Sequence, residues 1–254
     1  MALTTWGACN EFYDRISISS QFRDKVRQRQ SAVTDVLRKA FPSDSDIRYR
    51  STTLMGSLGR GTASNPVDDI DLLVHLSVND DLWASSYHSN SQEFLYRVRR
   101  ALNNASTVQK IGARGQAVRL FYTDNLTVDV AAVEKYTDGS FAIPDGQGNW
   151  LNTNPLKHAE YINSKNTELN GNLKRFIQIV KQWNNAHSSR LQSFHLEMLA
   201  ARTFANLNNN RRTALEMFFC YNLNNLSVED PAGFSGDLST YLTQSQRQQV
   251  YQSI

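Results

Sequence analysis

The chain has 254 residues, 40% of them hydrophobic, and its 27 Lys and Arg against 24 Asp and Glu leave a formal charge of only +3. No apolar run approaches the ~20 residues of a membrane helix, and the N-terminus lacks the basic region and apolar core of a secretory signal. Cys9 and Cys220 provide neither a zinc spacing nor a disulfide framework. These features argue against membrane-spanning and disulfide-rich secreted proteins and predict a cytoplasmic protein of one large domain or two modest lobes.

The first half of the chain alternates between predicted helices and strands. Apolar residues at helical spacing predict a helix over 20–41, which Ser19 or Ser20 caps and Pro42 ends. Asp124-Asn125 marks a turn between two of the later strands. The other expected elements are a helix at 91–103 and strands at 47–55, 69–76, 108–112, 117–122 and 126–133.

The second half reads almost entirely as helix. Prolines, glycines and asparagines over 141–155 predict a loop and the lobe boundary. We therefore expect an α/β catalytic lobe with a mixed sheet over 1–150, a helical lobe over 151–254, an active site in the cleft between them, and the first long helix bracing both. Helices are expected from the apolar stripe that begins at Leu173, and over about 194–205, 213–221 and 238–253.

Two carboxylates lie at alternating positions on an apolar strand. Because side chains alternate along a strand, Asp69 and Asp71 share one face, and Ile70 and Leu72 point to the other. Asp68 has the opposite parity and is expected in solvent at the start of the strand. Taken alone, Asp69 and Asp71 fit two exposed carboxylates on a wet strand face better than a functional pair, but the Gly-Ser turn upstream reverses that preference.

A third acid, Asp129, interrupts the apolar strand Leu126–Val133. A charge there needs a partner, which is either an arginine or a metal that it shares with Asp69 and Asp71. Three carboxylates suit octahedral Mg²⁺ or Mn²⁺. Two such ions would activate a sugar hydroxyl and neutralise departing pyrophosphate. In that scheme Asp69 and Asp71 bridge the ions, and Asp129 holds the hydroxyl-activating one or acts as general base.

Gly56-Ser57 opens the turn that precedes these acids. A glycine lets the backbone approach a triphosphate closely, a following helix N-terminus offers free N–H groups, and the Ser57 hydroxyl adds a donor. The plain alternative is a strand-to-helix turn with Ser57 as its cap. The order of this turn and the acids favours a phosphate cradle.

The chain resembles the DNA polymerase β-like nucleotidyltransferase superfamily. It is most similar to the bacterial cGAS/DncV-like nucleotidyltransferases, the CD-NTases of anti-phage (CBASS) signalling, over about residues 20–250. The matching segments are Gly56–Ala63, Asp69–Val74, Val128–Val130, Ile143–Gly146, Trp150, Pro155, Leu173–Phe176, Lys181–Asn184, Ser193–Glu197 and Asp230–Gly233.

The resemblance implies roles for three residues of the helical half. Lys181 and Ser193 would hold the triphosphate, and Phe194 would stack on a base. Without the family, Lys181 is an edge residue whose ammonium reaches solvent, Ser193 caps a helix, and Phe194 is core. His195 and Glu197 are expected to be helix-packing or surface residues.

The predicted function is a metal-dependent synthase that joins nucleoside triphosphates into a cyclic di- or trinucleotide messenger and releases pyrophosphate. We expect a monomer with no membrane partner, whose product binds a separate effector, and a regulatory protein or an RNA as activator. The alternatives are a non-cyclising transferase acting on RNA or protein, and a nucleotide- or partner-binding module without turnover. A basic stretch bears on the first alternative, as either a solvated face or an RNA surface: Arg97, Arg99, Arg100, Lys110, Arg114 and Arg119.

Overall fold

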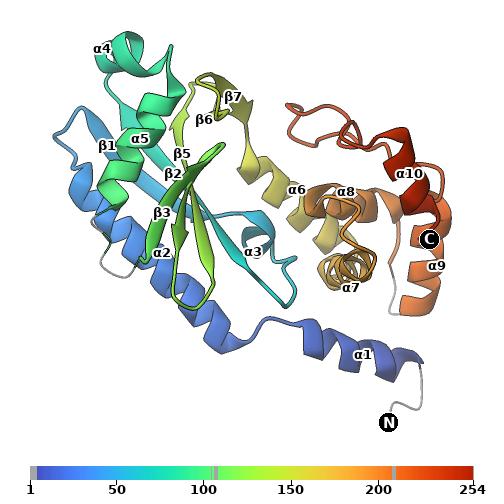
Figure 1. Cartoon of the computed structure of the whole chain (residues 1–254). Coiled ribbons are helices and arrows are strands. Elements are labelled where there is room, and N and C mark those ends of the chain that lie inside the picture. Colours follow the sequence, from blue (N-terminus) through green and yellow to red (C-terminus); the bar gives the residue numbers. More distant parts are fainter. Residues whose placement is uncertain (1–4, 104, 106–107, 208–209, 254) are drawn as a thin grey trace. The chain divides into compact units, whose positions relative to one another are not determined.

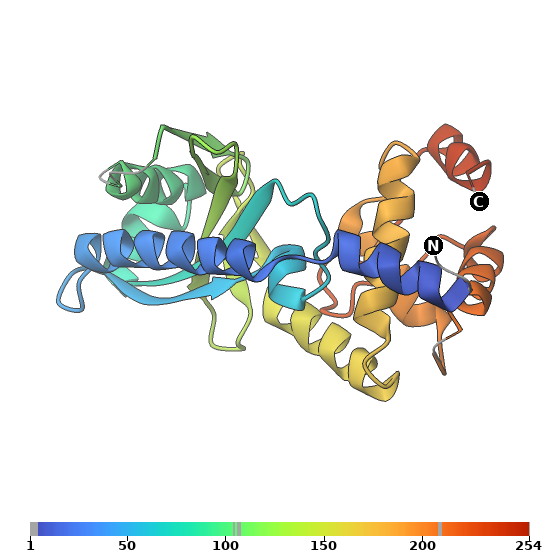
Figure 2. The ribbon, with the colours of Figure 1, turned by 90° about the horizontal axis from the view of Figure 1, so that it is seen from below.

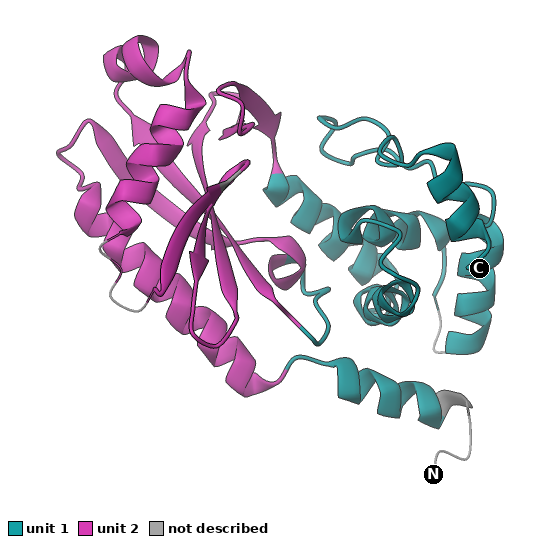
Figure 3. Ribbon diagram, viewed as in Figure 1, with its two compact units in different colours: residues 1–18, 60–66, 155–254 teal, residues 19–59, 67–154 magenta. Residues whose placement is uncertain are grey.

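The structure is a computed structural model that describes residues 5–103, 105, 108–207 and 210–253. The expectation that the N-terminus carries no secretory signal concerns in part residues 1–4, which lie outside the described residues. The chain forms two compact units (Figure 3). The sheet unit comprises Ser19–Gly59 and Val67–Asn154, and the helical unit comprises Met1–Ile18, Arg60–Pro66 and Pro155–Ile254.

The sheet unit is built on a seven-stranded mixed sheet (Figure 1). Its main path runs β1-β2-β5-β4-β3, and β6 and β7 extend it from β5. Only the β2–β5 pair is parallel among the strand pairs of the described residues. The elements are α2 (Ser20–Ala40), β1 (Ile47–Leu54), α3 (Gly56–Arg60), β2 (Asp69–Val78), α4 (Asp80–Leu82), the π-helix η1 (Trp83–Tyr87), α5 (Ser91–Leu102), β3 (Lys110–Arg114), β4 (Ala117–Phe121), β5 (Thr127–Lys135), β6 (Phe141–Pro144) and β7 (Trp150–Thr153).

Helices α2 and α5 pack against one face of this sheet and against each other (Figure 2). As predicted, Ser19 caps α2, its hydroxyl accepting a hydrogen bond from the Phe22 N–H, and α2 ends just before Pro42. On β2, Ile70, Leu72 and further residues of the same parity are buried beneath the helices. The other face of the sheet is therefore left for the residues of opposite parity, which include the predicted acids.

The predicted loop over 141–155 is wrong, because this segment forms the β6–β7 hairpin. Every residue of β6 is buried, and β6 continues the sheet from β5. The Asp145 carboxylate accepts hydrogen bonds from the N–H groups of Gln147 and Asn149, and Gly146 has a positive φ of 82°. The turn residues thus mark a tight hairpin inside the sheet unit rather than a linker.

The helical unit buries its own apolar core. The stripe predicted on α7 is confirmed, since Leu173, Phe176, Ile177 and Val180 are fully buried. The segment Arg60–Pro66 belongs to this unit and contacts α7, where the Gln178 amide donates to the Ala63 carbonyl oxygen at 2.6 Å. The helices are α1 (Thr5–Ile16), α6 (Pro155–Glu168), α7 (Leu173–Ala186), α8 (Ser193–Thr203), α9 (Arg211–Asn222) and α10 (Gln244–Tyr251).

The helical unit also departs from the sequence-based expectations. The helix expected over 238–253 begins only at Gln244, because Thr243 and Gln246 form a capping box there. The first long helix, α2, lies wholly in the sheet unit instead of bracing both parts, and α1, which was not predicted, packs on α7 and α9. The compact units therefore differ from the predicted division at 150/151, because residues 1–18 and 60–66 group with the helices and residues 151–154 group with the sheet. No described helix is both long and apolar enough to cross a membrane.

Candidate active site

Asp69, Asp71 and Asp129 meet on the face of the sheet opposite to α2 and α5. The parallel pairing of β2 with β5 sets Asp71 directly beside Asp129, and Asp69 precedes Asp71 by two residues on the same face. Each of the three offers a carboxylate oxygen, and these oxygens all lie within 4.8 Å of one another. The sheet register thus brings Asp129 to two acids that lie 60 and 58 residues before it in the sequence.

The strand parity agrees with the burial of these residues. Ile70, Leu72, Val128 and Val130 are fully buried, while Asp71 and Asp129 are half-buried and Asp69 is exposed. Asp68 is exposed and lies just before β2, where its carbonyl oxygen accepts the Thr127 N–H at 3.0 Å. Asp68 therefore takes the solvent position that its parity predicts.

The turn after β1 brings Gly56 against this site. The Met55 N–H donates to the Asp71 carbonyl oxygen at 2.8 Å, and Gly56 has a φ of 60°. A Cβ on Gly56 would lie 1.8 Å from Asp71 Oδ2, so no other residue fits without moving that carboxylate. Ser57 follows within α3, a helix of five residues. The glycine turn and the acid pair are therefore one packed arrangement.

Arg119 is the partner of Asp129. The two residues are register neighbours on β4 and β5. Arg119 Nε donates to Asp129 Oδ1 at 2.6 Å, and Nη2 donates to Oδ2, which makes a bidentate ion pair. Of the two partners predicted for Asp129, an arginine or a shared metal, the arginine is thus present, and Asp129 also lies beside the two other acids.

The electrostatics of the site favour a cation. Partial removal from water, and then the negative charge of Asp129, raise the pKa of the Asp69 carboxyl group. The hydrogen bond to Asp129 raises the pKa of Arg119, and the charges of Asp69 and Asp71 contribute. Three clustered carboxylates are the oxygen donor set that Mg²⁺ or Mn²⁺ takes in proteins, so the residues present fit a divalent ion.

The helical unit contains a buried charged group that includes Lys181. Glu197 on α8 is fully buried; its Oε1 accepts from Lys181 Nζ at 2.6 Å, and its Oε2 accepts from Arg60 Nε at 2.7 Å. The Lys181 ammonium also donates to the Thr62 carbonyl oxygen at 3.2 Å. Burial by itself would raise the pKa of Glu197, but the charges of Lys181 and Arg60 hold that pKa below its ordinary value. Lys181 therefore does not extend its ammonium to solvent.

Phe194 and Ser193 lie at the start of α8, in the same unit. Phe194 is half-buried, with the His158 ring centroid 4.4 Å from its own and the Arg60 guanidinium carbon 5.1 Å from its centroid. His158 Nε2 is also 2.8 Å from Asp230 Oδ1. Ser193 is the exposed first residue of α8. Arg60 thus connects Phe194 to the Glu197–Lys181 pair.

Sequence reasoning missed Arg119 and Arg60 as site residues. Arg119 had a usable signal: a hairpin centred on the turn at Asp124-Asn125 pairs position 119 with 129. No sequence signal indicated the contact between Arg60 and Glu197, because it joins residues that are 137 positions apart. His195 is the packing residue that was expected, since it is buried between the Tyr241 hydroxyl and the Leu226 carbonyl oxygen.

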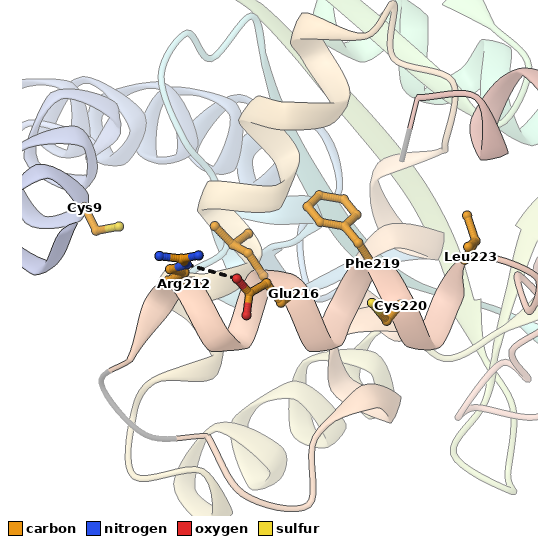
Figure 4. Close-up of a pocket in the computed structure, with 7 residues that line it drawn as sticks. Cys9, Arg212, Glu216, Phe219, Cys220 and Leu223 are labelled. Atoms are coloured by element: carbon orange, nitrogen blue, oxygen red, sulfur yellow. Dashed lines mark hydrogen bonds and ion pairs between the residues drawn. The ribbon is translucent and has the colours of Figure 1, made fainter.

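An apolar pocket of the helical unit contains none of the predicted site residues (Figure 4). Arg212 and Glu216 form an ion pair of 3.0 Å along its wall. Helix α1 contributes Cys9 to the lining, and Leu223 follows the end of α9. The other lining residues are on α9: Arg212, Leu215, Glu216, Phe219 and Cys220.

The family model described as the Second Messenger Oligonucleotide or Dinucleotide Synthetase domain (SMODS) matches residues 1–166. A probable cyclic nucleotide synthase of Bacillus cereus is 26% identical, over 73% of this chain and 66% of that protein. A cyclic AMP-AMP-AMP synthase of Escherichia coli is 23% identical, over 82% of this chain and 67% of that protein. The chain thus spans about two thirds of the length of these two relatives.

Solved structures of CdnC from Escherichia coli MS115-1 share the fold. CdnC with ATP matches with a TM-score of 0.77 at 19% identity, and CdnC in complex with HORMA-deltaN matches with a TM-score of 0.78 at 18% identity. Each comparison covers 96% of this chain and 87% of the other chain.

Proposed function

Because this chain belongs to the Second Messenger Oligonucleotide or Dinucleotide Synthetase family, a family of bacterial CD-NTases, we propose that it is a nucleotidyltransferase that joins nucleoside triphosphates into a cyclic di- or trinucleotide and releases pyrophosphate. The observation that carries this proposal is the meeting of Asp69, Asp71 and Asp129, whose carboxylate oxygens lie within 4.8 Å beside the Gly56 turn. The names of the sequence relatives support the same activity.

The strand on which each acid lies determines its proposed role in metal binding. Asp69 and Asp71, on one strand, would hold two divalent ions between them, and Asp129 on the neighbouring strand would hold one of the two. Mg²⁺ or Mn²⁺ bound there would supply the positive charge that activates a ribose hydroxyl and neutralises the departing pyrophosphate. The missing side chain of Gly56 leaves room for the Asp71 carboxylate, because a Cβ there would lie 1.8 Å from Oδ2, and the backbone N–H groups of the turn would contact phosphate.

Further roles are part of the proposal. Ser57 would donate its hydroxyl to a phosphate oxygen, Ser193 and Lys181 would contact the triphosphate, and Phe194 would stack on a base. For Lys181 this requires that its ammonium serve a phosphate in addition to Glu197, with which it pairs in this structure. The exposed position of Ser193 supports its role more directly.

The biological setting is proposed on the same basis. We place the enzyme in the cytoplasm as a monomer acting in anti-phage signalling, with nucleoside triphosphates as substrates and a separate effector that binds the product. CdnC was solved with ATP and with HORMA-deltaN. These two complexes of CdnC support a nucleotide substrate and favour a regulatory protein over an RNA as the activator.

Incubation of the chain with all four nucleoside triphosphates and Mg²⁺ or Mn²⁺ tests this function. Products are treated with phosphatase and identified by mass spectrometry. The proposal expects a phosphatase-resistant cyclic product that an Asp69→Ala/Asp71→Ala variant does not make. Linear products with free ends would support the non-cyclising alternative instead.

A further inference from the structure

One guanidinium engages both carboxylate oxygens of Asp129. Arg119 Nε donates to Oδ1 at 2.6 Å and Nη2 donates to Oδ2, and the two residues are register partners in neighbouring strands. The side chains are 23% and 18% exposed, so solvent screens the pair only in part. The pairing is therefore built into the sheet and is not a surface contact between two flexible side chains.

This pairing bears directly on the metal ligands. Each carboxylate oxygen has two lone pairs, so a hydrogen bond does not by itself prevent a metal from binding. The electrostatic conflict is larger, because a divalent cation at Asp129 would lie near a guanidinium that already compensates that charge. Arg119 also interacts with the charges of Asp69 and Asp71, so its influence covers the whole acid cluster.

The acid cluster needs such a charge when no metal is bound. Three carboxylates within 4.8 Å repel one another, and two of them are half-buried. Arg119 supplies a positive charge to this cluster through its ion pair with Asp129. One residue can therefore stabilise the metal-free fold and oppose the metal at the same carboxylate.

We propose that Arg119 is the resident counter-cation of the acid cluster, which neutralises Asp129 in the metal-free protein and competes with the divalent ion for it. The inference rests on the proposed function, because that function assigns the metal to Asp69, Asp71 and Asp129. A divalent ion at Asp129 would then weaken the ion pair with Arg119 through charge repulsion. The concentration of metal at which the site fills is set in part by Arg119, which is not itself a ligand.

Mn²⁺ binding to the purified full chain without nucleotide tests this inference. Electron paramagnetic resonance of free Mn²⁺ gives the dissociation constant for the wild type, Arg119→Met and Arg119→Lys. Methionine keeps much of the length and removes the charge, whereas lysine keeps the charge but cannot form the fork. Arg97→Met, on the exposed surface of α5, removes the same charge at a distance and controls for the change in net charge. Asp129→Asn controls for the site.

We expect Arg119→Met to bind Mn²⁺ at least about tenfold more tightly than the wild type, the change that corresponds to one lost hydrogen bond between charged groups. Arg119→Lys is expected to bind with intermediate affinity, Arg97→Met like the wild type, and Asp129→Asn more weakly. Without metal, Arg119→Met is expected to melt at a lower temperature than the wild type, and Mn²⁺ to raise its melting temperature more.

Equal or weaker Mn²⁺ binding by Arg119→Met would overturn the inference. If that variant fails to fold, Arg119→Lys decides, because affinity equal to or lower than that of the wild type would contradict competition. The product assay tests the proposed function separately. Tighter Mn²⁺ binding by Arg119→Met without any nucleotide product would refute the proposed synthase and leave the competition for Asp129 intact. A cyclic product together with unchanged Mn²⁺ affinities would support the proposed synthase and refute the competition for Asp129.

Discussion

Gly56 lies so close to Asp71 that a Cβ on the glycine would stand 1.8 Å from the carboxylate oxygen Oδ2. The contact joins the turn after β1 to the strand β2, and the hydrogen bond from the Met55 N–H to the Asp71 carbonyl oxygen holds the two backbones together. The glycine is thus required both by its φ of 60° and by the space that the acid occupies.

A Gly56→Ala variant should lose nucleotidyltransferase activity by about 100-fold, because a new methyl group displaces a carboxylate that the site needs in place. Initial rates of pyrophosphate release measure the loss. Gly115→Ala is the matched control, since Gly115 has a φ of 58° but open space where its Cβ would lie. That control should cost about 1–2 kcal/mol of stability from its backbone alone and keep its activity. Equal activity in both alanine variants would contradict the packing argument.

Glu197 should be a major contributor to the stability of the helical unit. Its fully buried carboxylate faces Lys181 and Arg60, so Glu197→Gln removes the counter-charge from the buried ammonium of Lys181 and from the partly buried guanidinium of Arg60. We expect a loss of about 3–5 kcal/mol in the free energy of unfolding, measured in urea. Glu216→Gln removes an exposed partner of Arg212 on α9 and should change that free energy by less than about 0.5 kcal/mol. A small effect of Glu197→Gln would show that the buried ion pairs contribute little.

The pH dependence of stability should include a contribution from His195. Burial lowers the pKa of this imidazole below its ordinary value of 6.5, so the native state releases its proton more readily than the unfolded state does. The contribution is therefore fully present above about pH 6.5 and is lost as the pH falls through the native pKa. Unfolding free energies between pH 8 and pH 5 should decline less in His195→Gln than in the wild type. An equal decline in His195→Gln and in the wild type would contradict this contribution.

Much of the sheet and its acids could be predicted from local pattern. Parity alone assigned Asp69 and Asp71 to the open face and Asp68 to solvent, because side-chain direction alternates along any strand. The loop predicted over 141–155 failed because proline and glycine mark hairpin turns as readily as linkers, and the burial of β6 depends on its pairing with β5.

The charged contacts of the site were less accessible from sequence. The pairing of Arg119 with Asp129 follows from the hairpin register around the turn at Asp124-Asn125, which depends on the exact length of the loop. The group formed by Arg60, Lys181 and Glu197 depends on tertiary packing between segments far apart in the chain. No periodicity or motif spacing encodes such a contact.

The most direct test of the central claim compares Asp71→Asn with Asp68→Asn in one assay of phosphatase-resistant cyclic product. Both changes remove one negative charge from the same segment, but only Asp71 lies within the acid cluster that meets Asp129. The account predicts that Asp71→Asn makes no detectable cyclic product and that Asp68→Asn makes nearly as much as the wild type. Cyclic product from Asp71→Asn at the wild-type rate would contradict the assignment of the active site to this face of the sheet.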